Sequence, residues 1–192
     1  MIVVLNGAPR SGKSSIVAEI QKTFPGVWMN LGVDVSRCMT PESAQPGIGL
    51  RPGEDGHPAA DVVPRLYAAL WDSIAAHERL GLNVAADVGL YDERVAADAA
   101  ARVAGLGVLF VGVRCPVDVV VERRRQDAGG RRYSTEPGLV ERWERAVHGR
   151  WTYDVEVDTS IAGPAQCAQA VAKRLASDPP PTAFSRLATF LR

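Results

Sequence analysis

Short apolar runs alternate along the chain with segments in which apolar residues recur every three or four positions. Runs of this kind predict five strands, over residues 2–5, 27–33, 83–88, 108–113 and 153–158. Helical spacing predicts the segments between them, with the main helices at 61–81, 92–103, 139–147 and 165–175. Strands that alternate with helices indicate an α/β protein with a doubly wound parallel sheet, whose ligands bind at the carboxyl ends of the strands.

The pattern also predicts how individual elements begin and end. Asp61 is expected to cap the helix that follows it, and the 108–113 run is expected to be a central strand. The second strand would deliver Asp34 at its carboxyl end, where ligands bind.

The chain length of 192 residues predicts one domain, over 1–178, followed by a tail at 179–192. Three prolines after Asp178 separate the tail, whose Phe184, Leu187 and Phe190 would dock on the body or on a partner. Residues 35–60 are rich in proline and glycine and lack a sustained period, so we expect them to cover the substrate.

One stretch after the first strand matches the pattern G-x-x-x-x-G-K-[ST] at every fixed position, and it lies between a predicted strand and a predicted helix. Its glycines let main-chain N–H groups close around phosphate oxygens, and the helix N-terminus adds its positive end. Lys13 would reach the β and γ phosphates of ATP, and Ser14 would bind Mg²⁺. The predicted ATP-phosphate site comprises Gly7, Ala8, Pro9, Arg10, Ser11, Gly12, Lys13, Ser14 and Ser15.

Charge and cysteine content narrow the function classes. Basic and acidic residues both number 22, which gives no indication of a nucleic-acid or membrane partner and favours a small-molecule substrate. The three cysteines are far apart and suit a reducing cytoplasm, and neither an apolar run of 18 residues nor a leader sequence is visible.

Further candidate residues follow from the predicted elements. Asp87 ends the third strand as a Walker B type aspartate would, and either holds Mg²⁺ or orients the acceptor. Tyr67 and Trp71 lie on the apolar stripe of a helix, where they either pack in the core or face an acceptor pocket. Residues 122–134 form an arginine-dense segment that predicts either a lid over the triphosphate or a solvated basic helix end.

Several blocks in order resemble the chloramphenicol phosphotransferase family over about residues 1–176. These are residues 2–7 leading into 11–15, then Gly32-Val33-Asp34, 112–115 and 153–159. The resemblance implies ATP-dependent phosphorylation of a hydroxyl, chloramphenicol's primary hydroxyl in the family, on a fold similar to shikimate and nucleoside monophosphate kinases. It also implies that Asp34 is the base that contacts the acceptor hydroxyl.

The same resemblance bears on the lid and on the adenine site. Glu122, Arg124 and Arg131 line up with the family's lid, whereas Ala128 and Gly130 depart from it, so which lid arginines act stays open. Arg114 either stacks on adenine, as in similar kinases, or pairs with a carboxylate.

We therefore predict an ATP- and Mg²⁺-dependent phosphotransferase acting on a hydroxyl of a small molecule, chloramphenicol or a related antibiotic, and hence an antibiotic-resistance enzyme. The catalytic residues would be Asp34, Lys13, Arg124 and Arg131. The alternatives are a metabolic kinase for a nucleoside, sugar or shikimate-like acid, and a P-loop switch or ATPase, against which the sequence lacks N-K-x-D. The sequence does not predict the oligomeric state.

Overall fold

A five-stranded parallel sheet forms the centre of the computed structural model, which describes residues 1–44, 61–126 and 135–191. The strand order is β2-β3-β1-β4-β5, so β1 is the central strand and the 108–113 run lies beside it. The strands are β1 (Ile2–Asn6), β2 (Trp28–Asn30), β3 (Asn83–Val88), β4 (Val108–Arg114) and β5 (Val155–Asp158). The predicted doubly wound α/β fold is confirmed.

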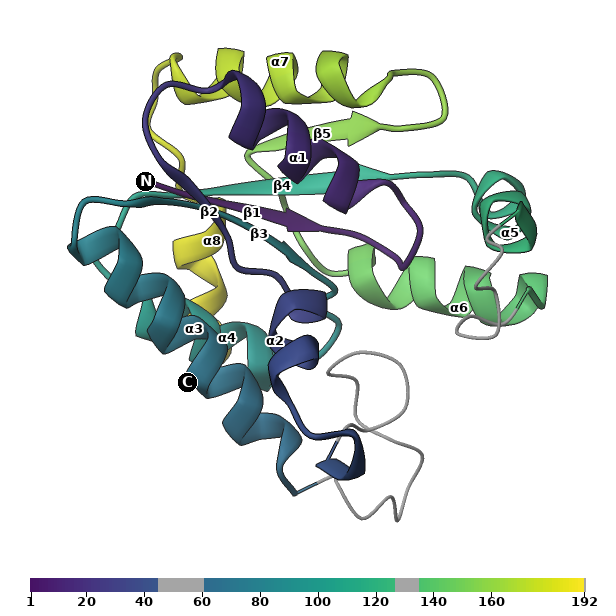
Figure 1. Cartoon of the computed structure of the whole chain (residues 1–192), viewed down its shortest axis with the longest axis horizontal. Coiled ribbons are helices and arrows are strands. Elements are labelled where there is room, and N and C mark those ends of the chain that lie inside the picture. Colours follow the sequence, from purple (N-terminus) through teal and green to yellow (C-terminus); the bar gives the residue numbers. More distant parts are fainter. Residues whose placement is uncertain (45–60, 127–134, 192) are drawn as a thin grey trace.

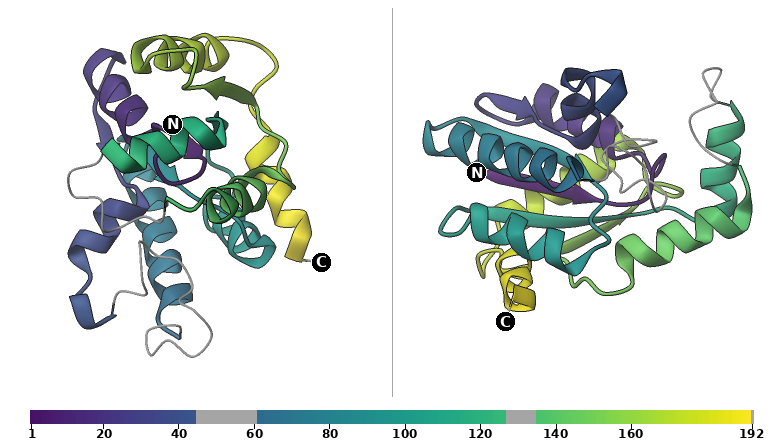
Figure 2. Two further views of the ribbon diagram at one scale, coloured as in Figure 1. Left: turned by 90° about the vertical axis from the view of Figure 1, so that its right-hand side faces the viewer. Right: turned by 90° about the horizontal axis from the view of Figure 1, so that it is seen from below.

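Helices cover both faces of the sheet (Figures 1 and 2). One face carries α1 (Lys13–Thr23) and α7 (Pro164–Leu175), and the other carries α3 (Val63–Arg79), α4 (Glu93–Arg102) and the short α8 (Ala183–Arg186). Beyond the carboxyl ends of the strands stand α5 (Val117–Gln126) and α6 (Pro137–His148). The remaining short elements are α2 (Val33–Met39), η1 (Glu42–Ala44) and η2 (Leu187–Leu191).

Alternation along the buried strands divides the core into two layers. In β1, Val3 and Leu5 pack with the α1 and α7 side, whereas Ile2 and Val4 pack with α3 and α4. All four side chains are completely buried, as expected for a central strand of a parallel sheet covered on both faces. This rigid centre fixes the carboxyl edge, where the predicted site residues gather.

Three predicted boundaries were wrong. The second strand stops at Asn30, and Gly32 in an extended conformation precedes helix α2, so Asp34 lies in a first helical turn and not at a strand end. Val62 and not Asp61 is the N-cap of α3, where Pro64 in the first turn sets the helical φ. The last strand begins at Val155 because Asp154 turns its carboxylate to main-chain N–H groups, including that of Phe110.

The segment after the triple proline folds back onto the sheet. Phe184 is 1% exposed and packs with ring centroids 5.3 Å from Trp71 and 5.2 Å from Phe110. The Asp154 carboxylate accepts hydrogen bonds from the main-chain N–H groups of Thr182 and Ala183, which anchors the start of α8. Phe184 and Leu187 therefore dock on the body of the protein. The side chain of Phe190 lies outside the described residues.

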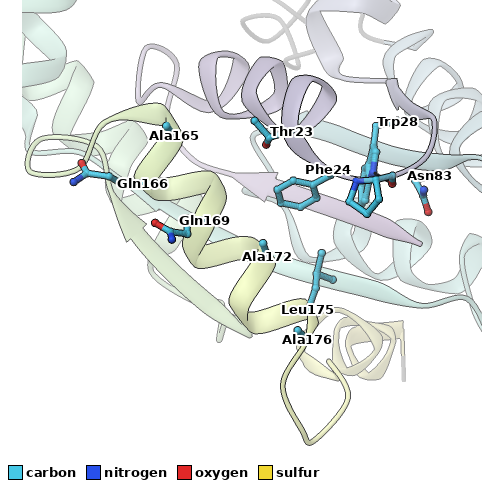
Figure 3. A pocket seen from close by; sticks show the side chains of 11 residues that line it. Thr23, Phe24, Trp28, Asn83, Ala165, Gln166, Gln169, Ala172, Leu175 and Ala176 are labelled. Carbon is cyan, nitrogen blue, oxygen red and sulfur yellow. Dashed lines mark hydrogen bonds between the residues drawn. The ribbon is translucent and has the colours of Figure 1, made fainter.

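A mainly apolar cavity of about 700 Å³ lies between α7 and the turn after α1 (Figure 3). Phe24, Trp28 and Leu175 line it. This turn follows the last residue of α1, whereas the phosphate-binding motif precedes the first one, so the cavity and the motif lie at opposite ends of that helix. In the described part of the chain, no helix has the length and apolarity needed to cross a bilayer.

Candidate active site

The glycine-rich motif forms an open loop between β1 and α1. Arg10 has φ 75° and Gly12 has φ 95°, so the loop closes through two left-handed residues before the helix starts. No side chain caps the amino end of α1, which leaves its first N–H groups to face a phosphate. The Lys13 ammonium lies over the loop and donates to the carbonyl oxygens of Gly7 and Ala8 at 2.8 and 2.9 Å.

Close packing holds this loop against the neighbouring strand ends. A Cβ atom on Gly7 would lie 2.5 Å from the carbonyl oxygen of Val113, so only glycine fits there. The Thr159 hydroxyl, just after β5, donates to the carbonyl oxygen of Ser11 at 2.6 Å. The loop is therefore fixed by contacts from two other strands before any ligand arrives.

The Ser14 hydroxyl and the Asp87 carboxylate meet at the carboxyl edge of the sheet. Ser14 Oγ donates to Asp87 Oδ2 at 2.6 Å, and Asp87 is 8% exposed. These are the two protein oxygens that the sequence assigns to Mg²⁺. The described residues contain no cluster of three or more metal-ligating side chains, and Mg²⁺ at a phosphate site takes few protein ligands besides phosphates and water. Ser14 and Asp87 fit such an ion.

Asp34 approaches the same edge from α2. A Cβ atom on Gly32, the residue before α2, would lie 1.7 Å from Asp87 Oδ1, so the Asp87 carboxylate packs against the backbone at residue 32 only because this residue is glycine. Asp34 follows two positions later in the first turn and is exposed. The structure thus places Asp34 two residues after the glycine that contacts the Asp87 carboxylate.

Two adjacent arginines of α5 bind the phosphate loop and its surroundings. Arg124 is 3% exposed and donates to the carbonyl oxygen of Pro9 at 3.2 Å. Arg123 donates to both Thr159 Oγ1 and Thr159 O, at 2.9 and 2.7 Å. Arg131 and the rest of the expected lid between 127 and 134 lie outside the described residues, as do residues 45–60 of the expected substrate cover.

The geometry bears on two alternatives that the sequence left open, for Arg114 and for the pair Tyr67 and Trp71. Arg114 pairs with Glu156, Nε to Oε2 at 2.5 Å, which is the carboxylate pairing and not a free stacking position. Trp71 is completely buried against Phe184, and Tyr67 is 5% exposed within the same core cluster. Both aromatic residues are thus in core positions.

A polar network beside the phosphate loop escaped the sequence analysis. Asn6, the last residue of β1, donates to the carbonyl oxygen of Val147 at 2.8 Å and to the Tyr153 hydroxyl at 2.9 Å. His148 Nδ1 lies 2.7 Å from the same hydroxyl, and His148 Nε2 lies 3.3 Å from Glu144 Oε1. The sequence signal was the i, i+4 spacing of Glu144 and His148 at the border of the apolar stripe of α6.

Burial perturbs both members of this pair. It raises the pKa of Glu144 to about 7, although the positive charges of Arg114 and Lys13 act in the opposite direction. Burial and the same two cations lower the pKa of His148 to about 3. His148 is therefore neutral at physiological pH, and Glu144 titrates near it.

Comparison with known proteins identifies the family of the chain. Residues 1–176 match the family described as chloramphenicol phosphotransferase-like proteins. Two curated relatives from strains of Mycobacterium tuberculosis, each bearing the name "Putative O-phosphotransferase", are 27% identical over 201 residues, which cover 97% of this chain and 87% of theirs.

Solved structures share the fold. The tunicamycin resistance protein of Deinococcus radiodurans has a TM-score of 0.66 and 21% identity, with 94% of this chain and 98% of that one covered. The APS kinase of Mycobacterium tuberculosis, solved with AMPPNP and APS, has a TM-score of 0.67 and 17% identity, with 92% and 97% covered.

At such identities the solved structures establish the fold alone, and that fold is a P-loop kinase fold. The family match adds the chemistry, which is phosphoryl transfer by a nucleotide-binding enzyme. The protein is a P-loop phosphotransferase, and it belongs to the chloramphenicol phosphotransferase-like family.

Proposed function

We propose that this enzyme transfers the γ-phosphoryl group of ATP to a hydroxyl of a small molecule, and that the acceptor is chloramphenicol or a related antibiotic, which phosphorylation inactivates. The observation that carries the proposal is the meeting of Ser14, Asp87 and the Gly32–Asp34 turn at one edge of the sheet. A nucleotide switch needs the first two groups. An acidic side chain held beside them on a separate helix is what an acceptor hydroxyl requires.

The main-chain N–H groups of the loop and the amino end of α1 would bind the phosphates, and Lys13 would leave the carbonyl oxygens of Gly7 and Ala8 to contact the β and γ phosphates. Ser14 and Asp87 would hold Mg²⁺, which would supply positive charge next to the phosphates. Arg124, which donates to the carbonyl oxygen of Pro9, would add positive charge at the loop. Arg131 would supply a further charge from the lid.

Asp34 would accept the proton of the acceptor hydroxyl and aim its oxygen at phosphorus. In a loose transition state the attacking oxygen loses its proton late, so the position of the carboxylate matters as much as its basicity. An exposed aspartate in a first helical turn is open to a bound acceptor and can serve this role.

The test is mass detection of a phosphorylated product after the protein is incubated with ATP, Mg²⁺ and a panel of acceptors. The panel should contain chloramphenicol, nucleosides, neutral sugars and shikimate. A product 80 Da heavier than chloramphenicol is expected, as the mass of an added HPO₃ group, about 80 Da, requires. Phosphorylation of another panel member alone would replace the named acceptor, and ATP hydrolysis unaffected by every acceptor would contradict the transferase assignment.

A further inference from the structure

Arg10 has a backbone conformation that the rest of the described chain leaves to glycine. Its φ is 75°, and within residues 1–44, 61–126 and 135–191 no other non-glycine residue has a positive φ. The remaining positive values belong to Gly12, Gly26, Gly81 and Gly105. A Cβ atom in this conformation lies too close to the following carbonyl oxygen, so an arginine at position 10 is strained where a glycine would not be.

Hydrogen bonds from other elements hold the loop in this conformation. Three consecutive carbonyl oxygens, those of residues 9–11, accept in order from Arg124 at 3.2 Å, from Arg123 at 3.4 Å and from the Thr159 hydroxyl at 2.6 Å. All three bonds end on main-chain atoms of the loop, so they would form equally well with glycine at position 10. The surroundings therefore impose the left-handed conformation, and the arginine side chain does not create it.

Packing in the protein core does not account for an arginine at this position. Arg10 is exposed, whereas Ala8 and Ser11 of the same loop are completely buried. The phosphate-binding motif does not require the arginine either, because its pattern accepts any residue at position 10. Backbone strain that neither packing nor the motif explains indicates a function for the side chain.

The other cations described at the loop contact its main chain. Lys13 donates to two carbonyl oxygens of the loop, at 2.8 and 2.9 Å. Arg123 and Arg124 donate to two further ones from α5, which stands beyond the carboxyl ends of the strands (Figure 1). Arg10 differs from these two arginines because its side chain starts in the loop itself. A loop that closes around phosphates brings its own side chains next to them, and a guanidinium donates two parallel hydrogen bonds to a phosphate.

We propose that the guanidinium of Arg10 binds the terminal phosphates of the nucleotide and stabilises their negative charge during phosphoryl transfer. Lys13 and the main-chain N–H groups of the loop bind the same phosphates through the motif, and Arg10 adds a positive charge that the motif does not supply. The strain at residue 10 is retained because it places this charge in the loop. This inference rests on the use of ATP proposed above, and it does not depend on which acceptor is phosphorylated.

The experiment separates the guanidinium from the strain by two substitutions at one position. Arg10→Gly removes both, whereas Arg10→Ala removes the guanidinium and keeps a Cβ atom in the left-handed conformation. Isothermal titration calorimetry with Mg²⁺ present measures the Kd of each variant for AMPPNP, a non-hydrolysable analogue of ATP, and for AMP. Thermal unfolding without nucleotide measures the strain.

Both variants should bind AMPPNP about tenfold more weakly than wild type, as expected for the loss of a hydrogen bond between charged groups, and should bind AMP with unchanged affinity. The Tm of Arg10→Gly should exceed that of Arg10→Ala by about 2–4 °C, because only glycine relieves the strain. Arg10→Lys should recover part of the affinity for AMPPNP, since lysine keeps the charge and loses the paired donors.

Arg79→Ala is the matched control. It also removes one exposed arginine and so changes the net charge of the protein by the same amount, but Arg79 ends α3, just before β3 begins at the opposite edge of the sheet. This variant should bind AMPPNP and AMP with the affinities of wild type. A weaker binding of AMPPNP in the control as well would mean that net charge, and not the position of Arg10, determines the affinity, which would overturn the inference.

The other outcomes separate this inference from the function on which it rests. Wild-type affinity for AMPPNP in both Arg10 variants overturns it, and so does an equal loss for AMPPNP and AMP, which would come from a distorted loop. Equal Tm values for the glycine and alanine variants would remove the strain on which it is based. If wild-type protein does not bind AMPPNP, the proposed use of ATP fails and this inference with it. If it binds AMPPNP but phosphorylates no acceptor, only the proposed transfer to a hydroxyl fails.

Discussion

Asp34 is an exposed side chain whose carboxylate is assigned to the acceptor hydroxyl. In Asp34→Asn, phosphoryl transfer should fall by at least about 100-fold, because an amide cannot take up the hydroxyl proton. ATP affinity should change less than about two-fold, since Asp34 lies outside the phosphate loop. Lys13→Ala should instead impair both ATP binding and turnover. Product formation and ATP titration measure the two effects, and a fully active Asp34→Asn enzyme would remove the base assignment.

Gly32 permits the contact between the start of α2 and the Asp87 carboxylate, to which we assign Mg²⁺. In Gly32→Ala, the new methyl group would lie 1.7 Å from Asp87 Oδ1 and must displace either α2 or the carboxylate. We expect the Mg²⁺ concentration for half-maximal activity to rise by about tenfold and kcat to fall. Gly138→Ala is the control, because its Cβ atom meets nothing within 4 Å among the described residues. A Mg²⁺ titration of both variants tests this, and similar curves would argue against the contact's importance.

At the scale of elements, Arg123 joins α5 to the turn after β5 through two bonds to Thr159. Arg123→Lys keeps the charge but loses the fork that binds both oxygens, so unfolding free energy should fall by about 1–3 kcal/mol. KM for ATP should rise in parallel, since Thr159 also holds the carbonyl oxygen of Ser11 in the loop. Arg79→Lys is the control, because Arg79 is exposed at the end of α3 and makes one long hydrogen bond, 3.5 Å, to the carbonyl oxygen of Arg102. If urea unfolding gave the wild-type midpoint for both variants, Arg123 would not stabilise the contact between α5 and the turn after β5.

The sequence predicted the elements of this site unequally. The phosphate loop could be recognised from the sequence because its eight positions are contiguous. The approach of Asp87 to Ser14 could be expected because parallel strands end at one edge of the sheet. Asp34 was assigned to the correct edge but to a strand, because an apolar run does not reveal that Gly32 starts a helix. The hydrogen bond from Asn6 to Tyr153 joins residues 147 positions apart, and no local sequence pattern predicts such a contact.

At the scale of the whole molecule, the last residues contribute to the core of the sheet. Phe184→Ala removes a ring that contacts both Trp71 and Phe110, and the cavity should cost about 3–5 kcal/mol of unfolding free energy. Leu80→Ala, at a side chain that is 81% exposed, should cost less than about 0.5 kcal/mol. Chemical denaturation compares the two, and equal losses would mean that the tail does not stabilise the folded body.

The Glu144–His148 pair also makes a prediction about global stability against pH. Between pH 4.5 and 6.5 the unfolded chain carries one proton on this pair, on His148, whose ordinary pKa is 6.5. The folded protein also carries one, on Glu144, because its pKa is raised to about 7 while that of His148 is lowered to about 3. Equal proton numbers mean that the pair adds no pH dependence to the wild-type unfolding free energy in this window.

Single substitutions should expose the two opposite slopes. In Glu144→Gln, only His148 remains, the unfolded state binds more protons, and stability should rise from pH 4.5 to 6.5 by up to about 2–3 kcal/mol relative to wild type. In His148→Asn, only Glu144 remains, the folded state binds more protons, and stability should fall over the same range. The other titrating groups contribute equally to variant and wild type, so they cancel when the two unfolding free energies are subtracted. Urea unfolding at several pH values therefore measures the contribution of this pair. Curves parallel to wild type for both variants would show that neither group has a shifted pKa, whereas opposite slopes would establish a buried acid and a neutral imidazole beside the phosphate loop.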